Sequence, residues 1–482
     1  MDRLGRASLT SLPADIAVPS YLDREISVGI VHFGVGNFHR AHQAMYIDRL
    51  LQVGTADEWA ICGIGLFDRD ARMRDALVEQ DGLYTLALRH PDGNDEISVV
   101  GSIRRFLHAP DDPDAVLDQL TDPGVRIVSL TITEGGYVED ATDGKRAADD
   151  PNVVAEAANG LSAPLTAFGW IVAALRERRR RGIPPFTVLS CDNVPGNGTV
   201  ARRSVEAVAR MVAPELADWI AAEVSFPSTM VDRITPVTVD ADVDRIRDRA
   251  AFVDAWPVAA EPFEQWIIED DFPAGRPDFA AAGATVVADV HAYEAIKIRL
   301  LNGGHQAVAY IGQLAGYRYV HEALGDPRIA AFVRSYMEQD AAPTLAVPEG
   351  FDVPGYIDEL FHRFANPAIA DTLTRLGTDA SNRIPKFVVP ALRDRLAAGE
   401  TPRAGARLIA SWREFNRQAG AGAFTLDDES AHVLMESAAD PRRFLLALPT
   451  LAPLADAPAF VEAYLAACRI IAQEGVDAVL GS

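Results

Sequence analysis

The first half of the chain alternates short, continuous apolar runs with stretches of helical periodicity. Runs of this length, bounded by polar residues and glycines, are typical of buried strands in a parallel sheet. The runs that we expect to form such strands are residues 26–33, 59–64, 125–133, 186–190 and 224–226. Strands that alternate with helices predict a doubly wound α/β domain of the Rossmann type, which we place at residues 1–288.

From about residue 292 onward the strand pattern fades, and runs rich in Ala, Leu and Arg follow a helical period. The helices expected there are residues 293–315, 329–339, 356–364, 390–397, 403–417 and 458–473. We therefore predict a mainly α-helical second domain at residues 289–482. The boundary, near residues 285–292, is expected to form an inter-domain cleft, which is a preferred place for small-molecule sites.

A glycine-rich turn follows the first predicted strand directly. Its residues, Gly34-Val35-Gly36-Asn37-Phe38-His39-Arg40, lead into a helical pattern that continues to Leu51. In a strand-turn-helix unit of this kind, backbone N–H groups approach a pyrophosphate and the helix N-terminus faces its charge. His39 stands where the dinucleotide fingerprint has its third glycine, so we expect the strand and the helix to pack less closely there.

Two acidic residues, Asp68 and Asp70, follow the second predicted strand. A carboxylate at this place binds the adenosine ribose as a diol and repels a 2′-phosphate, which favours NAD over NADP. The alternative interpretation is a solvated charged turn in which Arg69 balances the two carboxylates. The pattern alone leaves both interpretations open.

The predicted helix at residues 293–315 carries a carboxylate, an amine, an amide and an imidazole: Glu294, Lys297, Asn302 and His305. At about 100° per residue, these side chains fall within an arc of roughly 140°. One helix face could present all of them to a bound alcohol or carbonyl, which indicates a proton-transfer site. The alternative is that Glu294 and Lys297 form an ion pair on a solvated face.

Polar loops follow the later predicted strands and contain Glu134, Asn193 and Asp232, one in each loop. In an open α/β sheet, ligands collect at the carboxyl ends of the strands. We therefore expect a nicotinamide and a substrate to meet at these loops. Each loop could also be a plain turn, and Asn193 lies close to a Pro-Gly pair that is typical of turns.

The 482-residue chain is 49% hydrophobic and carries a formal net charge of −24. Its length allows more than one domain with a core, and its charge argues against binding to nucleic acid or to an anionic membrane surface. We interpret the basic run at residues 178–181 as a solvated helix C-terminus. No apolar stretch is long enough to span a bilayer and the N-terminus lacks a signal-peptide pattern, so we expect a cytoplasmic protein.

The three cysteines, Cys62, Cys191 and Cys468, are widely spaced along the chain. An odd number without close pairs fits reduced thiols better than a disulfide framework. The sequence contains no C-x-x-C and no H-E-x-x-H motif, so we expect no protein-bound zinc or other metal.

Several motifs, taken together, resemble those of the polyol-specific long-chain dehydrogenases, in the same order and over nearly the whole chain. They are residues 34–43, 131–137, 190–193 and 230–236, together with Lys297, Asn302 and His305. Within that family the likeness is greatest to the branch that oxidises D-mannitol to D-fructose. The resemblance implies metal-independent, NAD-linked interconversion of a polyol and a ketose, by a Rossmann domain followed by a helical domain.

The resemblance also implies catalytic roles for individual residues. It makes Lys297 the general acid and base, and it makes Asn193 and Asn302 the pair that holds the reacting oxygen. His305 would position the substrate. Glu294 would act as a gate or a proton relay behind the lysine.

Binding residues are implied in the same way. Asp232, Arg375 and Arg383 would contact substrate hydroxyls, although the last position is usually lysine in the branch that oxidises mannitol. Asp70 matches the acidic residue that favours NAD, which agrees with the interpretation of the second strand. The other residues implied to bind the cofactor are Gly34, Gly36, Asn37, Phe38, His39, Arg40, Thr133 and Glu134.

Two alternatives remain beside the neutral polyol. Fructuronate and tagaturonate reductases share these motifs but act on sugar acids. Arg375 and Arg383 could also bind the carboxylate of a sugar acid. A non-catalytic NAD-binding sensor is the alternative of another class. The preferred polyol, among mannitol, arabinitol and sorbitol, depends on the shape of the pocket, and the resemblance suggests a monomer or a weak homodimer.

Overall fold

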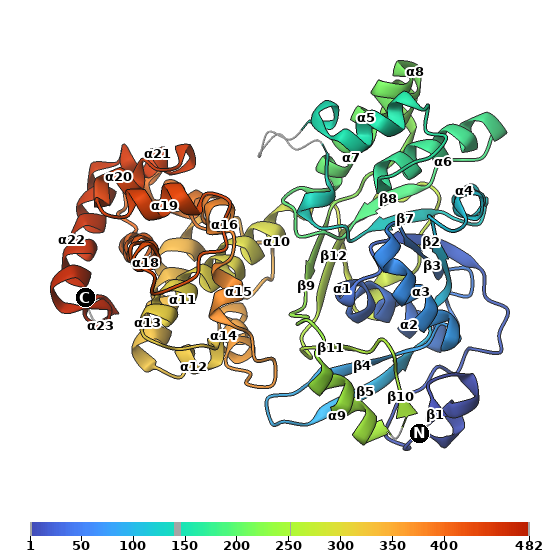
Figure 1. Cartoon of the computed structure of the whole chain (residues 1–482), viewed down its shortest axis with the longest axis horizontal. Helices are drawn as coiled ribbons and strands as arrows, with labels where there is room; N and C mark the ends of the chain where they lie inside the picture. Colours follow the sequence, from blue (N-terminus) through green and yellow to red (C-terminus); the bar gives the residue numbers. More distant parts are fainter. Residues whose placement is uncertain (1, 139–145, 251, 481–482) are drawn as a thin grey trace. The chain divides into compact units, whose positions relative to one another are not determined.

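The structure is a computed structural model that describes residues 2–138, 146–250 and 252–480. It divides into two compact units, Met1–Val290 and His291–Ser482. In Figure 1 the first unit runs from blue to yellow-green and the second from yellow to red. We describe each unit by itself.

A five-stranded parallel sheet forms the centre of the first unit, with the strand order β6-β3-β2-β7-β8. Its strands, in that order, are Ile103–His108, Ala60–Gly65, Val28–Phe33, Ile127–Leu130 and Thr187–Ser190. The chain builds the sheet to one side of β2 and then returns to add β7 on the other side. The gap between the carboxyl ends of β2 and β7 is therefore the point where ligands bind in such sheets.

Helices cover both faces of this sheet, as the predicted doubly wound fold requires. Ile30 and Ile61 face a core that includes residues of α2 (Gln43–Val53). Val31 and Cys62, their neighbours along the strands, face a second core that includes residues of α6 (Ala167–Arg181). Successive side chains of a strand point to opposite faces, so the continuous apolar runs reflect burial on both sides.

The first unit contains further helices. The α-helices are α1 (Asn37–Ala41), α3 (Ala71–Glu79), α4 (Pro113–Leu120), α5 (Pro151–Ala158), α7 (Asn197–Val212), α8 (Pro214–Glu223) and α9 (Asp240–Ala250). The 3₁₀ helices are η1 (Arg6–Ser11), η2 (Asp68–Asp70), η3 (Glu134–Gly136), η4 (Ala147–Asp149) and η5 (Phe279–Ala282).

Smaller sheets that the sequence did not predict flank the central one. β9 (Thr229–Asp232) pairs antiparallel with β12 (Gln265–Glu269), which also pairs parallel with β13 (Thr285–Val287). A second sheet has the order β11-β4-β5, and β1 pairs with β10. The strands of these two sheets are Val258–Ala260, Tyr84–Arg89, Asp95–Val100, Asp2–Arg3 and Phe252–Val253.

The strand predicted at residues 224–226 is wrong. This segment is extended but lies outside any strand, and its contact with the central sheet is the bond from Val188 N–H to the Ser225 carbonyl at 3.0 Å. Pro227 follows directly and has no N–H to continue a ladder. The strand begins only at Thr229, so Asp232 is the last residue of β9 and not part of a loop.

The basic run at the end of α6 is solvated only in part. Arg178 is buried, and its guanidinium donates hydrogen bonds to the carbonyls of Pro184, Leu120, Asp122 and Val125 at 2.8 to 3.1 Å. A buried guanidinium is stable only when its donors are satisfied in this way. The prediction of a solvated helix end is therefore wrong for Arg178, whereas the next three arginines are exposed.

The second unit is helical, as predicted. Its α-helices are α10 (His291–Ile296), α11 (Gly303–Leu314), α12 (Val320–Leu324), α13 (Pro327–Ser335), α14 (Val353–Phe364), α15 (Leu373–Gly377), α16 (Ala380–Phe387), α17 (Val389–Ala397), α18 (Arg403–Gly420), α19 (Ala431–Ser437), α20 (Pro441–Leu445), α21 (Ala452–Ala455), α22 (Pro458–Glu474) and α23 (Val476–Leu480). The 3₁₀ helices are η8 (Ala342–Thr344) and η9 (Pro449–Leu451). The buried helix α11 packs against α13, α15 and α18.

Two π-helical segments interrupt the pattern: η6 (Lys297–Asn302) and η7 (Tyr336–Ala341). The single helix predicted at residues 293–315 is therefore α10, η6 and α11 in succession. A π-helix closes i→i+5 hydrogen bonds and turns less per residue than an α-helix. The uniform 100° step that placed the candidate side chains on one arc does not hold between Lys297 and Asn302.

Within the described residues, no helix combines the length and the apolar character that crossing a membrane requires. All three cysteines are buried and none forms a disulfide. The expectation of reduced thiols stays a prediction.

Candidate active site

A cavity of about 420 Å³ opens in the first unit at the carboxyl ends of β2, β3 and β7. Its volume is in the range of small-molecule sites. The residues that line it are Gly34, Val35, Gly36, Ile64, Gly65, Leu66, Phe67, Arg69, Asp70, Met73, Phe106, Thr131, Ile132, Thr133, Gly135, Gly136, Val138, Asp150, Asn152, Leu165, Thr166 and Ala167. The cavity thus lies at the switch point of the sheet, where the sequence predicted the cofactor.

The glycine turn forms one wall of this cavity. Gly34 has φ of 90°, and a Cβ atom there would lie 2.0 Å from the Thr131 carbonyl oxygen. Only glycine fits this conformation and this approach. A Cβ atom on Gly36 would meet nothing closer than 3.8 Å, so the turn also leaves open space above its backbone. Both glycines line the cavity, as predicted for residues that approach a pyrophosphate.

The next four predicted cofactor residues are not among those that line the cavity. Arg40 is buried and donates hydrogen bonds to Asn37 Oδ1 at 2.7 Å and to the Trp256 carbonyl. His39 is buried as well, and Phe38 stacks on His42. These side chains therefore pack against protein, and the Arg40 N–H donates to the Gly36 carbonyl at 3.2 Å.

The helical pattern after the turn is broken once, contrary to the prediction of one helix to Leu51. α1 ends at Ala41, and α2 begins at Gln43. Between them, His42 adopts φ of −128° and ψ of −93°, and its Nε2 lies 3.0 Å from the Gln265 carbonyl oxygen. The hydrogen bond to β12 accounts for the break.

Asp70 lies on the cavity wall, whereas Asp68 does not. Asp70 Oδ2 accepts hydrogen bonds from the backbone N–H groups of Leu66 and Phe67, at 2.9 and 3.0 Å. The carboxylate therefore caps the turn after β3 and lies on the cavity wall. Of the two interpretations given for the acidic pair, the solvated turn fits the exposed Asp68, and the ribose site stays a prediction for Asp70.

The loop after β7 supplies the opposite wall, including Thr133 and Gly135. Thr133 has φ of 65° and ψ of 166°, a combination that is essentially restricted to glycine. Glu134, which was also predicted to bind the cofactor, begins η3 and is exposed, and it is not among the lining residues.

The loop after β8 and the end of β9 carry the other candidates of the first unit. Asn193 is exposed in that loop, whereas Asp232 is buried as the last residue of β9. Asn197 joins the loop to the start of β9, because its Nδ2 donates to the carbonyls of Asp192 at 3.0 Å and Thr229 at 2.8 Å. Asn193 and Asp232 therefore lie on two connected stretches of backbone.

The second unit holds the remaining candidates on one continuous helical segment. Lys297 begins η6 and is 8% exposed, so the solvated ion pair proposed as an alternative does not describe it. Asn302 ends η6, and its Oδ1 is buried without a hydrogen-bond partner among the described residues. His305 follows in α11 and stacks on Phe364, with ring centroids 4.3 Å apart. Glu294, in α10, is half-buried.

The two candidate arginines lie close together on α15 and α16. The Arg375 guanidinium forms a bidentate ion pair with Asp371, with Nε 2.6 Å from Oδ1. Arg383 Nη1 donates to the carbonyls of Arg375 and Leu376, at 3.1 and 3.4 Å. The positive charge of Arg375 is thus balanced within the protein.

Sequence reasoning missed two groups of residues. The first is the apolar wall of the cavity formed by Phe67, Met73 and Phe106. The second is Asp192, which lies directly before Asn193 and bonds to the loop after β7. Asp192 could have been predicted as a site residue, because it is a polar residue at the carboxyl end of a buried strand.

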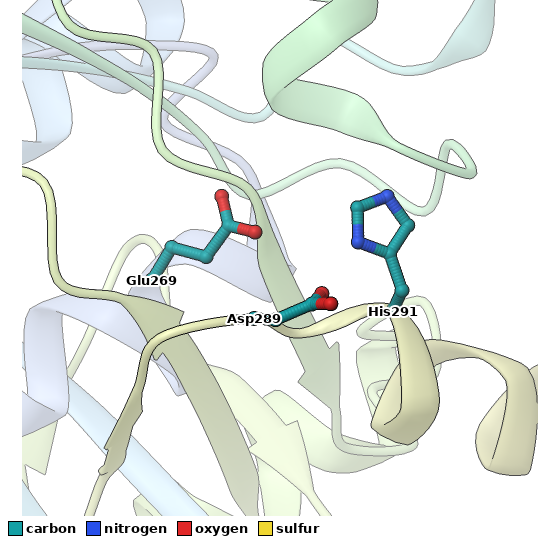
Figure 2. A group of neighbouring side chains, drawn as sticks. All are labelled: Glu269, Asp289 and His291. Carbon is teal, nitrogen blue, oxygen red and sulfur yellow. The ribbon is translucent and has the colours of Figure 1, made fainter. Parts of the chain in front are cut away.

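One group of metal-ligand side chains is present among the described residues: Glu269, Asp289 and His291. Figure 2 shows them, with their ligand atoms within 4.8 Å of one another. Glu269 also accepts a hydrogen bond from the Ser228 N–H at 2.7 Å. Asp289 and His291 are exposed, and exposed groups of this kind are common without an ion. The expectation of a metal-independent protein stays a prediction.

Comparisons with known proteins agree along the whole chain. The model of the mannitol dehydrogenase Rossmann domain matches residues 28–281, and that of the mannitol dehydrogenase C-terminal domain matches residues 289–471. Mannitol 2-dehydrogenase of Cereibacter sphaeroides is 48% identical over 394 residues, 82% of each chain.

Two solved structures match over nearly their full length. The Pseudomonas fluorescens mannitol 2-dehydrogenase, in a ternary complex with NAD and D-mannitol, is 42% identical with a TM-score of 0.88 and covers 99% of both chains. A D-sorbitol dehydrogenase in substrate-free form is 36% identical with a TM-score of 0.90 and covers 99% of this chain and 100% of that one.

Proposed function

The chain belongs to the mannitol dehydrogenase family of oxidoreductases, and we propose that it oxidises D-mannitol to D-fructose with NAD and a lysine base. The observation that carries this proposal is the 42% identity, over 99% of both chains, to a mannitol 2-dehydrogenase whose structure holds NAD and D-mannitol. The similarity to a D-sorbitol dehydrogenase supports activity on further polyols, with D-sorbitol and D-arabinitol as the first candidates.

The cavity of the first unit fits NAD. The Gly34–Gly36 turn would hold the pyrophosphate, the Asp70 carboxylate the adenosine ribose, and the apolar wall with Phe67 the adenine. The loop at Thr133 would hold the nicotinamide half. When bound, NAD supplies the acceptor for the hydride that leaves the carbinol carbon.

Lys297 takes the proton of the reacting hydroxyl on its Nζ atom. A lysine acts as a base near neutral pH only where its surroundings favour the neutral amine. The low exposure of Lys297, in a segment whose other buried residues are Leu300 and Leu301, supports this role. Arg299, in the same π-helix, is excluded from it because it pairs with Asp394 at 2.7 Å and donates to the Thr344 carbonyl.

Asn193 and Asn302 donate hydrogen bonds to the oxygen as it gains alkoxide character. Fixed amide donors of this kind are the equivalent of an oxyanion hole, and losing one costs on the order of 10² to 10³ in turnover. His305, held by its stack on Phe364, and the buried Asp232 orient the other hydroxyls. Glu294 gates the lysine or relays its proton.

A sugar acid is the second candidate substrate, and the contacts of the two arginines bear on the choice between a polyol and a sugar acid. A carboxylate of the substrate would need an arginine whose charge is available. Arg375 already forms a bidentate pair with Asp371, and Arg383 donates to backbone carbonyls. These contacts favour a neutral polyol, whose hydroxyls can accept from a guanidinium that is already paired.

Initial rates test the proposal. NADH formation is measured with D-mannitol, D-arabinitol and D-sorbitol, and NADH oxidation with D-fructose, fructuronate and tagaturonate. We expect turnover of D-mannitol and D-fructose. Turnover of the uronates alone would place the enzyme on the sugar-acid branch, and NADH binding without any turnover would indicate a sensor. Gel filtration of the same sample tests the expected monomer or weak homodimer.

A further inference from the structure

We propose that Asp192 is a positioning residue that holds Thr133 in the conformation in which it lines the cofactor cavity. Asp192 itself is not among the cavity-lining residues, and it acts through the backbone of the loop after β7. The inference rests on the proposed function, since it assumes that this cavity binds NAD.

Three hydrogen bonds join the Asp192 carboxylate to that loop. Oδ1 accepts from the Thr133 N–H at 2.8 Å. Oδ2 accepts from the Ile132 N–H at 3.1 Å and from the Tyr137 hydroxyl at 2.8 Å. Hydrogen bonds to an ionised acceptor are stronger than neutral ones, so one buried carboxylate fixes two successive peptide groups.

The residue fixed in this way is strained. Thr133 combines φ of 65° with ψ of 166°, in a region that L-residues other than glycine essentially avoid. A branched side chain makes that conformation still less favourable. Such a conformation persists only where the surrounding structure over-determines it. Thr133 is held at both of its peptide groups: its N–H donates to Asp192 Oδ1 at 2.8 Å, and its carbonyl accepts from the Gly136 N–H at 3.0 Å. The first of these contacts comes from outside the loop and is the one that Asp192 supplies.

Asp192 is itself held through its carboxylate and through its backbone carbonyl. The Ser190 hydroxyl bonds to the Tyr137 hydroxyl, which donates to Asp192. Asn197 Nδ2 donates to the Asp192 carbonyl at 3.0 Å and links it to β9 through the Thr229 carbonyl. Asp192 therefore links the end of β8 to the loop that forms this wall of the cavity. The same backbone leads directly into Asn193.

An amide at position 192 would break this arrangement in a predictable way. Asparagine keeps one acceptor oxygen and replaces the other by an NH₂ donor. If the oxygen stays with Ile132 and Tyr137, the NH₂ faces the Thr133 N–H, and two donors then oppose each other. Thr133 is released and can relax toward a favoured conformation. We expect nucleotide affinity to fall even though residue size is unchanged.

The test is the dissociation constant of NADH, measured by fluorescence titration without any polyol. We expect Asp192→Asn to raise it about tenfold or more. Tyr137→Phe is the matched control, because it removes only the hydroxyl donor and leaves both backbone bonds. Its dissociation constant should stay within about threefold of the wild-type value.

Glycine at position 133 gives the decisive comparison, because glycine adopts this conformation without strain. In a Thr133→Gly background, Asp192→Asn should raise the dissociation constant by no more than about threefold. An equal penalty in both backgrounds would overturn the proposal, since Asp192 would then act on something other than Thr133. Unchanged NADH binding in Asp192→Asn would overturn it as well.

A second measurement does not depend on the folding of Asp192→Asn. Thr133→Gly should unfold at a higher temperature than Thr133→Ala, whereas alanine is the more stable of the two at ordinary positions. The reverse order would contradict the strained conformation. If the wild-type protein binds NADH but oxidises no polyol, the proposed activity is refuted, and the role of Asp192 can still be measured. If the wild-type protein binds no NADH, both the proposed activity and the role of Asp192 are overturned.

Discussion

The imidazole of His39 lies stacked on the imidazole of His32, with ring centroids 3.4 Å apart and ring planes inclined by 13°. His39 occupies the place of a glycine in the dinucleotide fingerprint, so the stack replaces the close contact of strand and helix. His32 in turn bonds to β7 and to the loop after it, through Ser129 Oγ at 2.8 Å and Thr131 Oγ1 at 2.9 Å. Through His32, the extra side chain of His39 is thus connected to β7 and to the loop that follows it.

Burial keeps both rings neutral, and this predicts a loss of stability in acid. Burial lowers the pKa of His32 to about 3 and that of His39 well below its ordinary value. Below pH 6.5 the unfolded chain takes up protons that the folded chain does not, so stability falls as the pH falls from about 6.5 toward about 3. As the pH falls from 7 to 5, each of the two histidines should lower the free energy of unfolding by about 2 kcal/mol.

Urea unfolding at pH 7 and pH 5 measures this effect. Between pH 7 and pH 5, the free energy of unfolding should fall less in His39→Gln than in the wild type. The difference between the two falls should be about 2 kcal/mol. His432→Gln is the control, because the His432 side chain is 90% exposed and should leave the pH dependence unchanged. Equal pH dependence in His39→Gln and wild type would contradict a neutral His39.

Replacement of the proposed base separates chemistry from cofactor binding. Lys297→Ala should lower kcat for D-mannitol oxidation by about 10² to 10⁴, because general base catalysis contributes that much. Its dissociation constant for NADH should stay close to the wild-type value, since Lys297 is not among the residues that line the cofactor cavity. Lys386→Ala is the control lysine variant. A Lys297→Ala enzyme with near-normal kcat would exclude the lysine as the base.

The choice between the two acidic residues after β3 can be tested by charge alone. Asp70→Asn keeps an acceptor for the Leu66 and Phe67 N–H groups but removes the negative charge from the cavity wall. We expect the ratio of kcat/KM for NADP to that for NAD to rise about tenfold or more. Asp68→Asn should leave this ratio unchanged. An equal response of the two variants would show that the effect is one of general charge.

The contact between the start of α11 and the π-helix η7 predicts a compensating pair of variants. A Cβ atom on Gly303 would lie 2.4 Å from the Tyr336 hydroxyl oxygen and 3.0 Å from its Cε1. Gly303→Ala should therefore lower the unfolding free energy by about 1 to 3 kcal/mol through overpacking. Tyr336→Phe removes the nearest atom and should restore part of the loss. Additive effects of the two substitutions, measured by urea unfolding, would contradict this contact.

Much of the fold and part of the candidate site followed from local patterns. The apolar runs at residues 59–64 and 186–190 are β3 and β8, because continuous burial leaves a continuous apolar run. The turn at Gly34 was predictable because its conformation demands glycine. The roles of Lys297 and Asn302 came from the resemblance and stay predictions.

Other features depend on partners that lie far away along the chain. Arg178 resembles a solvated helix end in sequence, but its guanidinium is satisfied by the Leu120 and Val125 carbonyls. The π-helical turn that begins at Lys297 packs against η7, so its helical period was not visible in its own residues. Neither feature can be predicted from the pattern of a few neighbouring residues in the sequence.

The sequence by itself determined the fold class, the family and the place of the cofactor cavity, since these follow from periodicity and from glycine and polar residues at the ends of strands. Only the tertiary structure decided that His39 is neutral and stacked, that Asp232 ends a strand, and that Asp192 holds Thr133 in a strained conformation. The reason is that burial and hydrogen bonding are set by residues brought together from distant parts of the chain, and these contacts outweigh the local preferences that a sequence displays.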